Sequence, residues 1–534
     1  MKKHPVFARS IKILFLFILI QAFYAFNYKG YVREAGHTSN RIFFKNPGIT
    51  ESNEKIYCGF SHTLAIESNK TLWAWGNNNM GQLGDGSTVQ KIIPIQVSSL
   101  SGIKDAAGGY EHSLALKSNG TVWSWGRNVE GQLGDGTTTQ RKAPVKVSGL
   151  SNIIKVAAGY YHSLAIKADG SVWTWGKNNL GQLGNGTTAN SSLPAKLNAI
   201  TGVTDVTAGV EFSMALKSDG TVLSWGSNNW GQLGNGTTTT RSIPAPVTNG
   251  TNVIAIAAGR YHALALKADG TVWAWGHNVY GELGIGTTVY KTTPVQVLNL
   301  NNVIAIAAGE YHSLALKSDG TFWAWGRNEQ GQLGDLTFTL SRNLPVEVQQ
   351  LRGVSFFSAG TQTLSIMPAT STHLYWAFGN NNNGQLGDST KINKNFRVLV
   401  HFPLDENGNG SPEWQDYQYL NTPYSDNDRD GLLDWKEIMV YGTDAGSVDT
   451  NGDGLFDGTN VLVGLGPLIK DTDGDGLTNA KEAKNGTSPI LTDTDGDGVS
   501  DKEDAFPLDR FKTKKPPPNS SDHTPPVITL QEPI

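Results

Sequence analysis

The strongest constraint on the fold of this 534-residue chain is a sequence repeat of about 50 residues. Each copy carries a Gly-Gln-Leu-Gly tetrapeptide, which is Gly-Glu-Leu-Gly in one copy. The seven copies begin at Gly81, Gly131, Gly181, Gly231, Gly281, Gly331 and Gly384. In most copies a Trp-x-Trp-Gly motif precedes the tetrapeptide. Self-similarity at a fixed period predicts a repeat architecture in which each unit packs against its neighbours.

Each repeat contains the pattern of four short strands. Residues 261–267 and 271–276 alternate large and small side chains, which is typical of half-buried strands. Asp269 and Gly270 lie between them and predict a hairpin with a type I′ turn, in which both central residues have positive φ. The third and fourth strands are predicted at 294–297 and 303–307. Seven such units predict an all-β fold, a seven-bladed β-propeller of four-stranded blades.

The ends of the repeat array favour a closed ring over a linear solenoid. Neither end shows the polar capping repeat that a solenoid requires. The seventh unit lacks its last strand, and residues 55–59, just before the first repeat, match the missing piece. We therefore predict that this N-terminal strand completes the last blade. The propeller would then occupy residues 49–404 and expose no strand edge.

The full motif is A-G-x-x-H-S-L-A-L-K-x-D-G-x-V-W-x-W-G-x-N-x-x-G-Q-L-G. Its copies extend from Gly59 to about Leu404. This pattern resembles the regulator of chromosome condensation repeat over roughly two thirds of the chain. The resemblance implies a seven-bladed propeller. It also raises nucleotide exchange on a small GTPase, the activity of the family's namesake, as one possible function.

Residues that recur in every blade are expected to be architectural. A histidine recurs at one position, where Phe212 and Thr363 replace it in two copies, and we predict buried hydrogen-bonding roles for it. These histidines are His62, His112, His162, His262 and His312. The glutamine of each tetrapeptide is expected to satisfy backbone groups of its own loop.

Function is expected at positions that vary between blades. Hairpin geometry places the two residues after Ala-Gly and the residues after Trp-Gly on one rim of the propeller. Tyr, Trp and Arg at these positions are typical of protein-binding hot spots, although some of the tyrosines could instead pack between blades. The candidate partner-binding residues are Tyr110, Arg127, Tyr160, Tyr161, Trp230, Arg260, Tyr261, Tyr280, Tyr311 and Arg327.

No catalytic motif is found, so we predict a protein that is not an enzyme. The sequence contains no Gly-x-Ser-x-Gly, no His-Glu-x-x-His and no phosphate-binding loop. A secreted hydrolase remains an alternative, since separated acidic pairs could converge across the pore. The net charge of −4 gives no reason to expect nucleic acid.

The N-terminus has the pattern of an export signal. Basic residues precede a largely apolar stretch of fourteen residues from Ile13 to Phe26, which is short for a bilayer span. We predict a signal peptide at 1–25 and a linker at 26–48, with an uncleaved membrane anchor as the alternative. The single cysteine, Cys58, excludes a disulfide within the chain.

The segment 405–510 contains 24 acidic and 7 basic residues, a net charge of −17. Its acids follow the spacing of Ca²⁺-binding loops, with oxygen-bearing side chains at positions 1, 3, 5, 9 and 12 and glycine at position 6. The predicted ligands are Asp426, Asp428, Asp430, Asp434 and Glu437; Asp449, Asn451, Asp453 and Asp457; Asp471, Asp473, Asp475, Asn479 and Glu482; and Asp493, Asp495, Asp497, Asp501 and Asp504.

These loops repeat every 22 or 23 residues, which leaves too little chain for a helix on both sides of each loop. The segment therefore resembles thrombospondin type 3 repeats more than paired EF-hands, and the resemblance implies a calcium-stabilised stalk. An acidic disordered linker is the alternative. Residues 511–534 are proline-rich and predict an extended linker.

Together these features predict a monomeric, secreted or cell-surface protein whose propeller recognises an extracellular protein or glycan. One alternative is a secreted inhibitor of an extracellular hydrolase, similar to propeller-type β-lactamase inhibitors. Another is a guanine-nucleotide exchange factor.

Overall fold

The computed structural model describes residues 54–352, 354–368, 373–403, 426, 428–432, 437, 443–462, 465–509 and 512. The chain divides into two units, one ending at Asn421 and one beginning at Thr422. The predicted signal peptide, the linker at 26–48 and the proline-rich linker lie outside the described residues, apart from Lys512.

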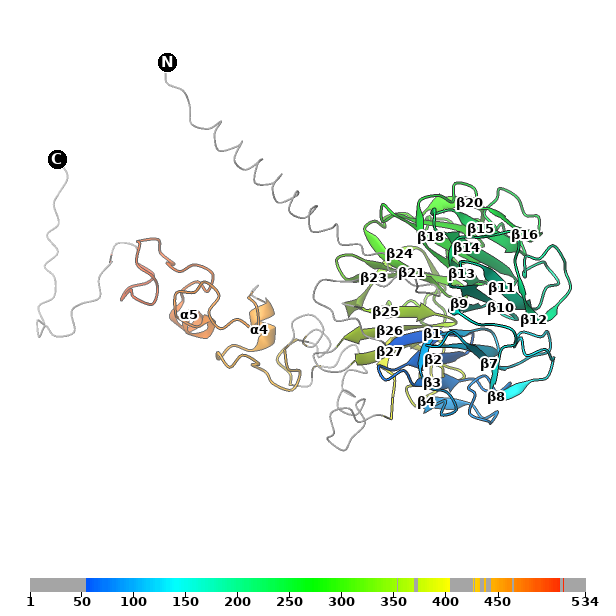
Figure 1. The fold of residues 1–534 in the computed structure, drawn as a ribbon. Helices are drawn as coiled ribbons and strands as arrows, with labels where there is room; N and C mark the ends of the chain where they lie inside the picture. Colours follow the sequence, from blue (N-terminus) through cyan, green and yellow to red (C-terminus); the bar gives the residue numbers. More distant parts are fainter. Residues whose placement is uncertain are drawn as a thin grey trace, which may run out of the picture. The chain divides into compact units, whose positions relative to one another are not determined.

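The part of the first unit that the structure describes contains 28 strands in seven antiparallel four-stranded sheets, from blade 1 (β1–β4) to blade 7 (β25–β28) (Figure 1). The innermost strands are β1 Lys55–Cys58, β5 Ile103–Gly108, β9 Ile153–Ala158, β13 Val203–Ala208, β17 Val253–Ala258, β21 Val303–Ala308 and β25 Phe356–Ala359. The second strands are β2 His62–Ile66, β6 His112–Lys117, β10 His162–Lys167, β14 Phe212–Lys217, β18 His262–Lys267, β22 His312–Lys317 and β26 Gln362–Pro368. The third strands are β3 Leu72–Gly76, β7 Val122–Gly126, β11 Val172–Gly176, β15 Val222–Gly226, β19 Val272–Gly276, β23 Thr321–Arg327 and β27 His373–Gly379. The outermost strands are β4 Lys91–Gln96, β8 Arg141–Lys146, β12 Ser191–Lys196, β16 Arg241–Pro246, β20 Lys291–Gln296, β24 Ser341–Arg352 and β28 Lys394–Leu399.

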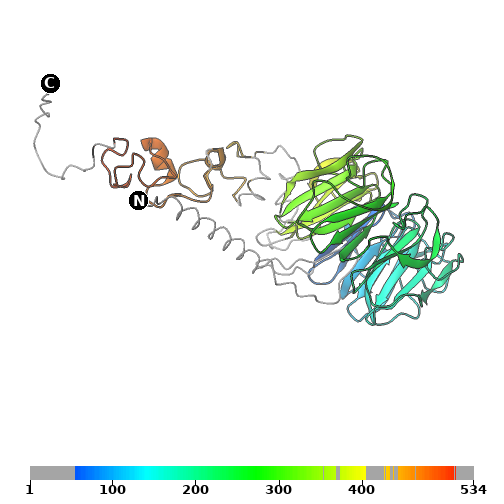
Figure 2. The same ribbon diagram turned by 90° about the horizontal axis from the view of Figure 1, so that it is seen from above.

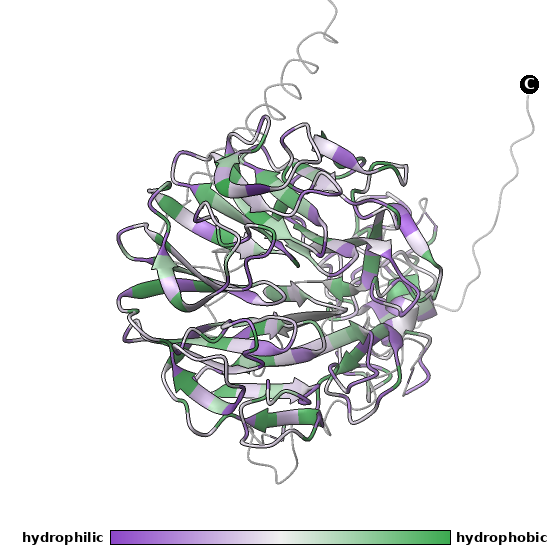
Figure 3. Cartoon of the chain, turned by 90° about the vertical axis from the view of Figure 1, so that its right-hand side faces the viewer, coloured by the Kyte–Doolittle hydropathy of each residue, from purple (hydrophilic) through white to green (hydrophobic). Residues whose placement is uncertain are grey.

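The predicted all-β propeller of four-stranded blades is therefore confirmed. Figure 2 shows the strands of each sheet side by side, and Figure 3 shows hydrophobic and hydrophilic residues alternating along many of them. Successive innermost strands contact one another around the whole ring, including β21 with β25 and β25 with β1. Each glutamine of the tetrapeptide accepts a backbone N–H of its own loop, as expected; Gln82 Oε1, for example, accepts the amide of Met80.

The hairpin prediction is correct, but the predicted turn type is wrong. Among the central residues, Gly120 has a φ of +78°, whereas Asn119 is not among the residues with positive φ. Asn119 Oδ1 instead accepts hydrogen bonds from the backbone N–H and the hydroxyl of Thr121. The side chain thus stabilises a turn of the Asx type, so a type I′ turn is not required.

The predicted closure by an N-terminal strand is also wrong. Strand β1 pairs with β2, its neighbour in sequence, so every blade is one continuous segment. The strand predicted to end each repeat is instead the innermost strand of the next blade. The seventh blade lacks nothing, because β25 supplies its innermost strand.

Packing between blades closes the ring. The carbonyl of Gln385 in blade 7 accepts hydrogen bonds from Thr63 Oγ1 and Trp75 Nε1 in blade 1, at 2.9 and 3.0 Å. Trp75 also packs in one apolar cluster with Tyr375 and Phe402 of blade 7. Blade 7 thus contacts blade 1 as other blades contact their neighbours. For example, Trp175 of blade 3 lies in the apolar core of blade 2.

A histidine–serine hydrogen bond between neighbouring blades, which we call the histidine latch, recurs around the propeller and adds to this packing. His162 Nε2 of blade 3 lies 2.9 Å from Ser213 Oγ of blade 4. Ser213 donates its hydroxyl proton to the carbonyl of Gln182, and Trp225 Nε1 donates to the same carbonyl. Since the serine proton is already used, the histidine must be the donor at Nε2. Equivalent pairs are His62–Ser113, His112–Ser163 and His262–Ser313, which confirms the predicted buried role of the histidines.

One exception to the latch, in blade 4, is explained by its partner. Phe212 stands in the histidine position of blade 4, and the facing residue of blade 5 is Ala263 in place of serine. Both side chains are fully buried in one apolar cluster. An apolar pair has thus replaced a hydrogen-bonded pair, and no buried hydroxyl is left without its partner.

The described residues of the second unit lie mainly in turns, with two short helices, α4 (Asp457–Leu462) and α5 (Asn479–Asn485). Thr478 caps the start of α5 by accepting the backbone N–H of Lys481, and Gly486 ends the helix with a φ of +81°. No helix among the described residues is long and apolar enough to cross a membrane.

Candidate functional site

The variable positions meet on one face because of the strand register. In each hairpin the first residue of the second strand pairs with the glycine that ends the Trp-Gly motif, as His162 pairs with Gly176. The residues before the second strand therefore lie next to those after the third strand. All ten candidate partner-binding residues lie at this end of the strands, and we call this face the aromatic rim.

One part of the aromatic rim is a stack of rings from blades 1 to 3. Tyr110 lies 4.4 Å from Phe60 and 4.8 Å from Tyr160, between ring centroids, and the two tyrosines are stacked. Tyr161 packs edge-on against Tyr110 at 5.5 Å. The guanidinium of Arg127 lies 4.9 Å from the centre of the Tyr161 ring, within the range of a cation–π contact.

A second part gathers rings from blades 4 to 6. His277 lies 4.7 Å from Trp230 and 5.6 Å from Tyr311, between ring centroids. Tyr280 lies 5.2 Å from Tyr311, and Arg327 lies 5.2 Å from the Tyr280 ring. Trp230 is the most open of these aromatic side chains, with 36% of its surface exposed.

Sequence reasoning missed the role of His277. Its Nδ1 lies 2.6 Å from Oε1 of the fully buried Glu282. Glu282 is the glutamate of the single Gly-Glu-Leu-Gly copy, and this copy also has histidine after Trp-Gly. The paired departure from the repeat pattern was the available signal.

Arg260 lies between the two parts of the aromatic rim. Its guanidinium lies 5.6, 5.2 and 5.3 Å from the ring centres of Tyr160, Tyr261 and Tyr311 and forms an ion pair with Glu310. Burial alone would lower the pKa of Arg260, but interactions with Tyr160, Tyr261 and Glu310 outweigh it and raise the pKa. Burial raises the pKa of Tyr311 to about 12. Arg260 is therefore held as a cation beside Glu310 and among three tyrosine rings.

Below Arg260 lies a cavity of about 120 Å³ on the propeller axis. Its walls are mainly the Ala-Ala-Gly ends of the innermost strands, and Phe60, Tyr160, Arg260 and Glu310 line its mouth. The Tyr160 hydroxyl donates to Glu310 Oε1 at 3.3 Å and so joins blade 3 to blade 6 across this mouth.

The cations of the aromatic rim are paired within the rim. Arg127 pairs with Glu130, Lys177 with Glu211, Arg260 with Glu310 and Arg327 with Glu329. The aromatic rim therefore offers aromatic surface and hydrogen-bonding groups, and its paired charges give it no strong electrostatic field of one sign.

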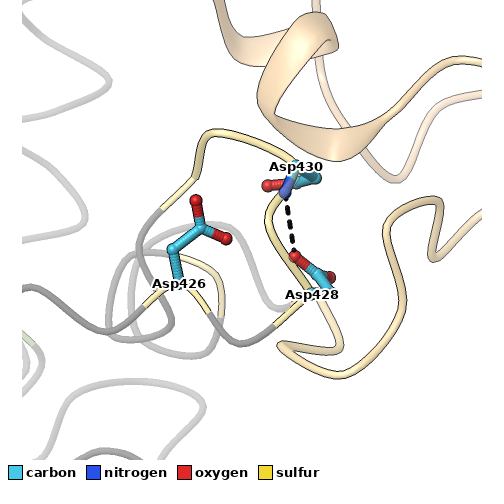
Figure 4. A group of neighbouring side chains, drawn as sticks. All are labelled: Asp426, Asp428 and Asp430. Carbon is cyan, nitrogen blue, oxygen red and sulfur yellow. Dashed lines mark hydrogen bonds between the residues drawn. The ribbon is translucent and has the colours of Figure 1, made fainter.

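The second candidate site is the set of acidic loops in the C-terminal unit. Asp426, Asp428 and Asp430 each offer a carboxylate oxygen within 4.8 Å of the others, and their side chains lie beside one another (Figure 4). The same holds for two further sets of predicted ligands, Asp471, Asp473 and Asp475, and Asp493, Asp495 and Asp497. Asp434 lies outside the described residues.

Glu482 shows that these residues fit a bound cation. Its side chain is fully buried, and both carboxylate oxygens lack a hydrogen-bond partner. Burial, followed by repulsion from Asp473 and Asp475, raises the pKa of Glu482 to about 7. A buried carboxylate without a partner is costly, and a hard oxygen-seeking cation such as Ca²⁺ would relieve that cost.

Comparison with known proteins agrees with this architecture. The sequence model of the RCC1-like domain matches residues 30–199 and 150–405. The chain belongs to the RCC1-like domain family. It is similar in fold to yeast RCC1 (Prp20), solved bound to Kap60, with a TM-score of 0.56 and 22% identity over 67% of this chain and 85% of that one. Human WBSCR16 has a TM-score of 0.54 and 24% identity over 60% of this chain and 89% of that one.

Two curated relatives are similar to this chain over about one repeat. Human HERC2, an E3 ubiquitin-protein ligase, is 41% identical over 49 residues, which are 9% of this chain and 1% of that protein. The ultraviolet-B receptor UVR8 of Arabidopsis thaliana is 37% identical over 51 residues, which are 10% of this chain and 12% of the receptor. The chain thus spans a small part of these relatives.

Proposed function

We propose that this chain is an exported, non-enzymatic binding protein that recognises an extracellular protein through the aromatic rim. The observation that carries the proposal is the gathering of aromatic residues from variable positions at one face. Tyrosine, tryptophan and arginine anchors dominate the energy of protein interfaces. The internal ion pairs of the rim favour a partner with aromatic and hydrogen-bonding groups over a highly charged polymer such as nucleic acid.

The proposal extends to Ca²⁺ in the C-terminal unit. Asp426, Asp428, Asp430 and Glu437 would hold one ion, and the three later loops would hold others through their corresponding residues. The ions would supply positive charge that neutralises clustered carboxylates and so orders the loops. The segment would then be a semi-rigid stalk of a secreted or cell-surface monomer. The buried, unpartnered carboxylate of Glu482 supports this reading.

The similarity in fold to yeast RCC1 favours a second candidate, nucleotide exchange on a small GTPase. The predicted export signal and the acidic loops favour the extracellular role over this candidate. Inhibition of an extracellular hydrolase and recognition of a glycan would use the same aromatic rim, so they are separate outcomes of one test.

The test is capture of a partner from the extracellular medium of the native source with the immobilised full-length chain. A variant with Tyr161→Ala, Trp230→Ala and Tyr261→Ala should lose the captured protein. A matched control with Ile254→Ala and Leu298→Ala changes exposed apolar residues at the other end of the strands and should retain it. Equal capture by both variants would contradict the proposed binding face. Capture of a small GTPase from cytosol alone would favour the second candidate.

A further inference from the structure

The acidic loops share carboxylates across loop boundaries. We call the four loops, by their first and last residues, loop 426–437, loop 449–460, loop 471–482 and loop 493–504. Asp430, Glu437 and Asp457 each offer a carboxylate oxygen within 4.8 Å of the others, and all three side chains are buried. Asp430 and Glu437 are positions 5 and 12 of the first loop, whereas Asp457 is position 9 of the second.

A backbone hydrogen bond joins the same two loops. The N–H of Gly458, the residue after Asp457, donates to Asp430 Oδ2 at 2.7 Å. The two later loops repeat this contact, because the N–H of Lys502, the residue after Asp501, donates to Asp475 Oδ2 at 3.0 Å. In both pairs of loops, the carboxylate at position 5 of one loop thus accepts the backbone N–H of position 10 of the next loop.

Glu482 occupies the corresponding place in the second pair. It is position 12 of loop 471–482, is fully buried and has two carboxylate oxygens without hydrogen-bond partners. Asp475, Glu482 and Asp501 thus stand at the same loop positions as Asp430, Glu437 and Asp457, although only the first three-residue set, Asp430, Glu437 and Asp457, has its carboxylate oxygens within 4.8 Å of one another. The unsatisfied oxygens of Glu482 mark a place for a cation.

The boundary between loop 449–460 and loop 471–482 lacks this arrangement. Position 9 of loop 471–482 is Asn479. Its amide oxygen accepts the N–H of Thr472, and its amide nitrogen donates to the carbonyl of Ile469. Position 12 of the preceding loop is the neutral Asn460. No hydrogen bond joins Asp453 to Ala480, the described residues that correspond to Asp430 and Gly458.

We propose that Asp457 and Asp501 are ligands of the calcium ion bound by the preceding loop, so that the four loops act as two coupled pairs. The inference rests on the proposed calcium function. In each pair, one ion would be held by position 5 and position 12 of the first loop and by position 9 of the second. Binding to the first loop would then fix the second loop in place, whereas the two pairs would bind independently of each other.

The test is calorimetric Ca²⁺ titration of the full-length chain and of two variants, Asp457→Asn and Asp501→Asn. Asparagine keeps an oxygen that can accept the backbone N–H of Thr450 or Thr494, so this backbone hydrogen bond is retained while the charge is lost. Asp501→Asn also removes the oxygen that accepts the Thr494 hydroxyl. Each variant should weaken Ca²⁺ binding by about tenfold or more in one pair and leave the other pair unchanged. The control is Glu503→Gln, which removes an exposed carboxylate from the same segment and should bind as the wild type does.

The outcomes separate this inference from the proposed calcium function. If the wild type shows no Ca²⁺ binding, both fail. If it binds and the two variants match the control, only the shared ligands are overturned. Limited proteolysis of the calcium-free wild type and variants detects any misfolding that the substitutions cause. A variant whose cleavage already differs from the wild type without calcium would show that Asp457 or Asp501 is structural, which also contradicts the inference.

Discussion

The propeller and the acidic loops are both repeats, but they are stabilised in different ways. Six of the seven propeller blades bury a tryptophan in a neighbouring blade and donate its indole N–H to a backbone carbonyl, as Trp225 does to Gln182; blade 7 has Phe378 at this position. Among the described residues after 425, the only buried hydrophobic residues are Leu432, Ala445 and Leu465. We infer from this comparison that a repeat with an apolar face completes its own fold, and we propose that a repeat that buries carboxylates requires a bound cation.

The largest expected difference between the two regions follows calcium removal. EDTA should make the segment 405–510 rapidly cleavable by protease, because its clustered carboxylates then repel one another. The propeller should resist cleavage equally with and without EDTA. The measurement is limited proteolysis of the full-length chain followed by mass spectrometry. If both regions resist the protease equally in EDTA, the proposed dependence of the acidic segment on calcium is contradicted.

A single tryptophan should show how far the propeller depends on packing between blades. Trp175→Ala should destabilise the propeller by about 3–5 kcal/mol, because a fully buried ring and its hydrogen bond are lost. Trp173→Ala, two residues away and only partly buried, should cost clearly less. Chemical denaturation of both variants provides the comparison. Equal losses of stability in the two variants would mean that the buried contact between blades contributes no more to stability than the partly buried Trp173 does.

The histidine latch predicts acid sensitivity of the propeller alone. Burial lowers the pKa of His162 from 6.5 to about 3, so the folded state keeps it neutral while the unfolded state takes up a proton below about pH 6.5. Stability should therefore be constant above this pH and fall progressively towards pH 4. The double variant His162→Phe with Ser213→Ala copies the natural Phe212–Ala263 pair. It should make this decline less steep by the share of one histidine, since His62, His112, His262 and His312 are buried in the same way. The measurement is the free energy of unfolding against pH, and an unchanged slope would contradict the assignment.

The smallest expected effect on stability concerns the aromatic rim. Tyr161→Ala and Trp230→Ala should each change the free energy of unfolding by no more than about 0.5–1 kcal/mol, because both side chains reach solvent. Partner binding should fall far more. A loss of stability as large as that of Trp175→Ala would identify these residues as core and remove them from the candidate site.

Much of the propeller follows from local sequence pattern. Alternating side chains and turn residues are local signals, and they predicted the strands, the hairpins and the placing of Tyr161 and Trp230 on one face. The assignment of each innermost strand was wrong, because periodic sequence cannot show where one unit ends and the next begins. Closure through Gln385, Thr63 and Trp75 joins residues more than 300 positions apart, so no local pattern could reveal it.

The candidate sites show the same limit. The spacing of Asp471, Asp473 and Asp475 predicted one carboxylate cluster within one loop, and the structure contains it. The joining of Asp457 to Asp430 and Glu437 depends on how two loops pack, which spacing within a loop does not encode. His277 and Glu282 were visible only as a paired departure from the repeat.

Hydrogen–deuterium exchange of the full-length chain, with and without Ca²⁺, tests the central claim most directly. The backbone amides of Gly454, Gly476 and Gly498 donate to loop carboxylates. We predict that calcium strongly slows exchange at these amides and leaves the amides of the propeller strands unchanged. Unchanged exchange in the loops, or an equal change in both regions, would contradict the view that the propeller is self-sufficient and the loops depend on calcium.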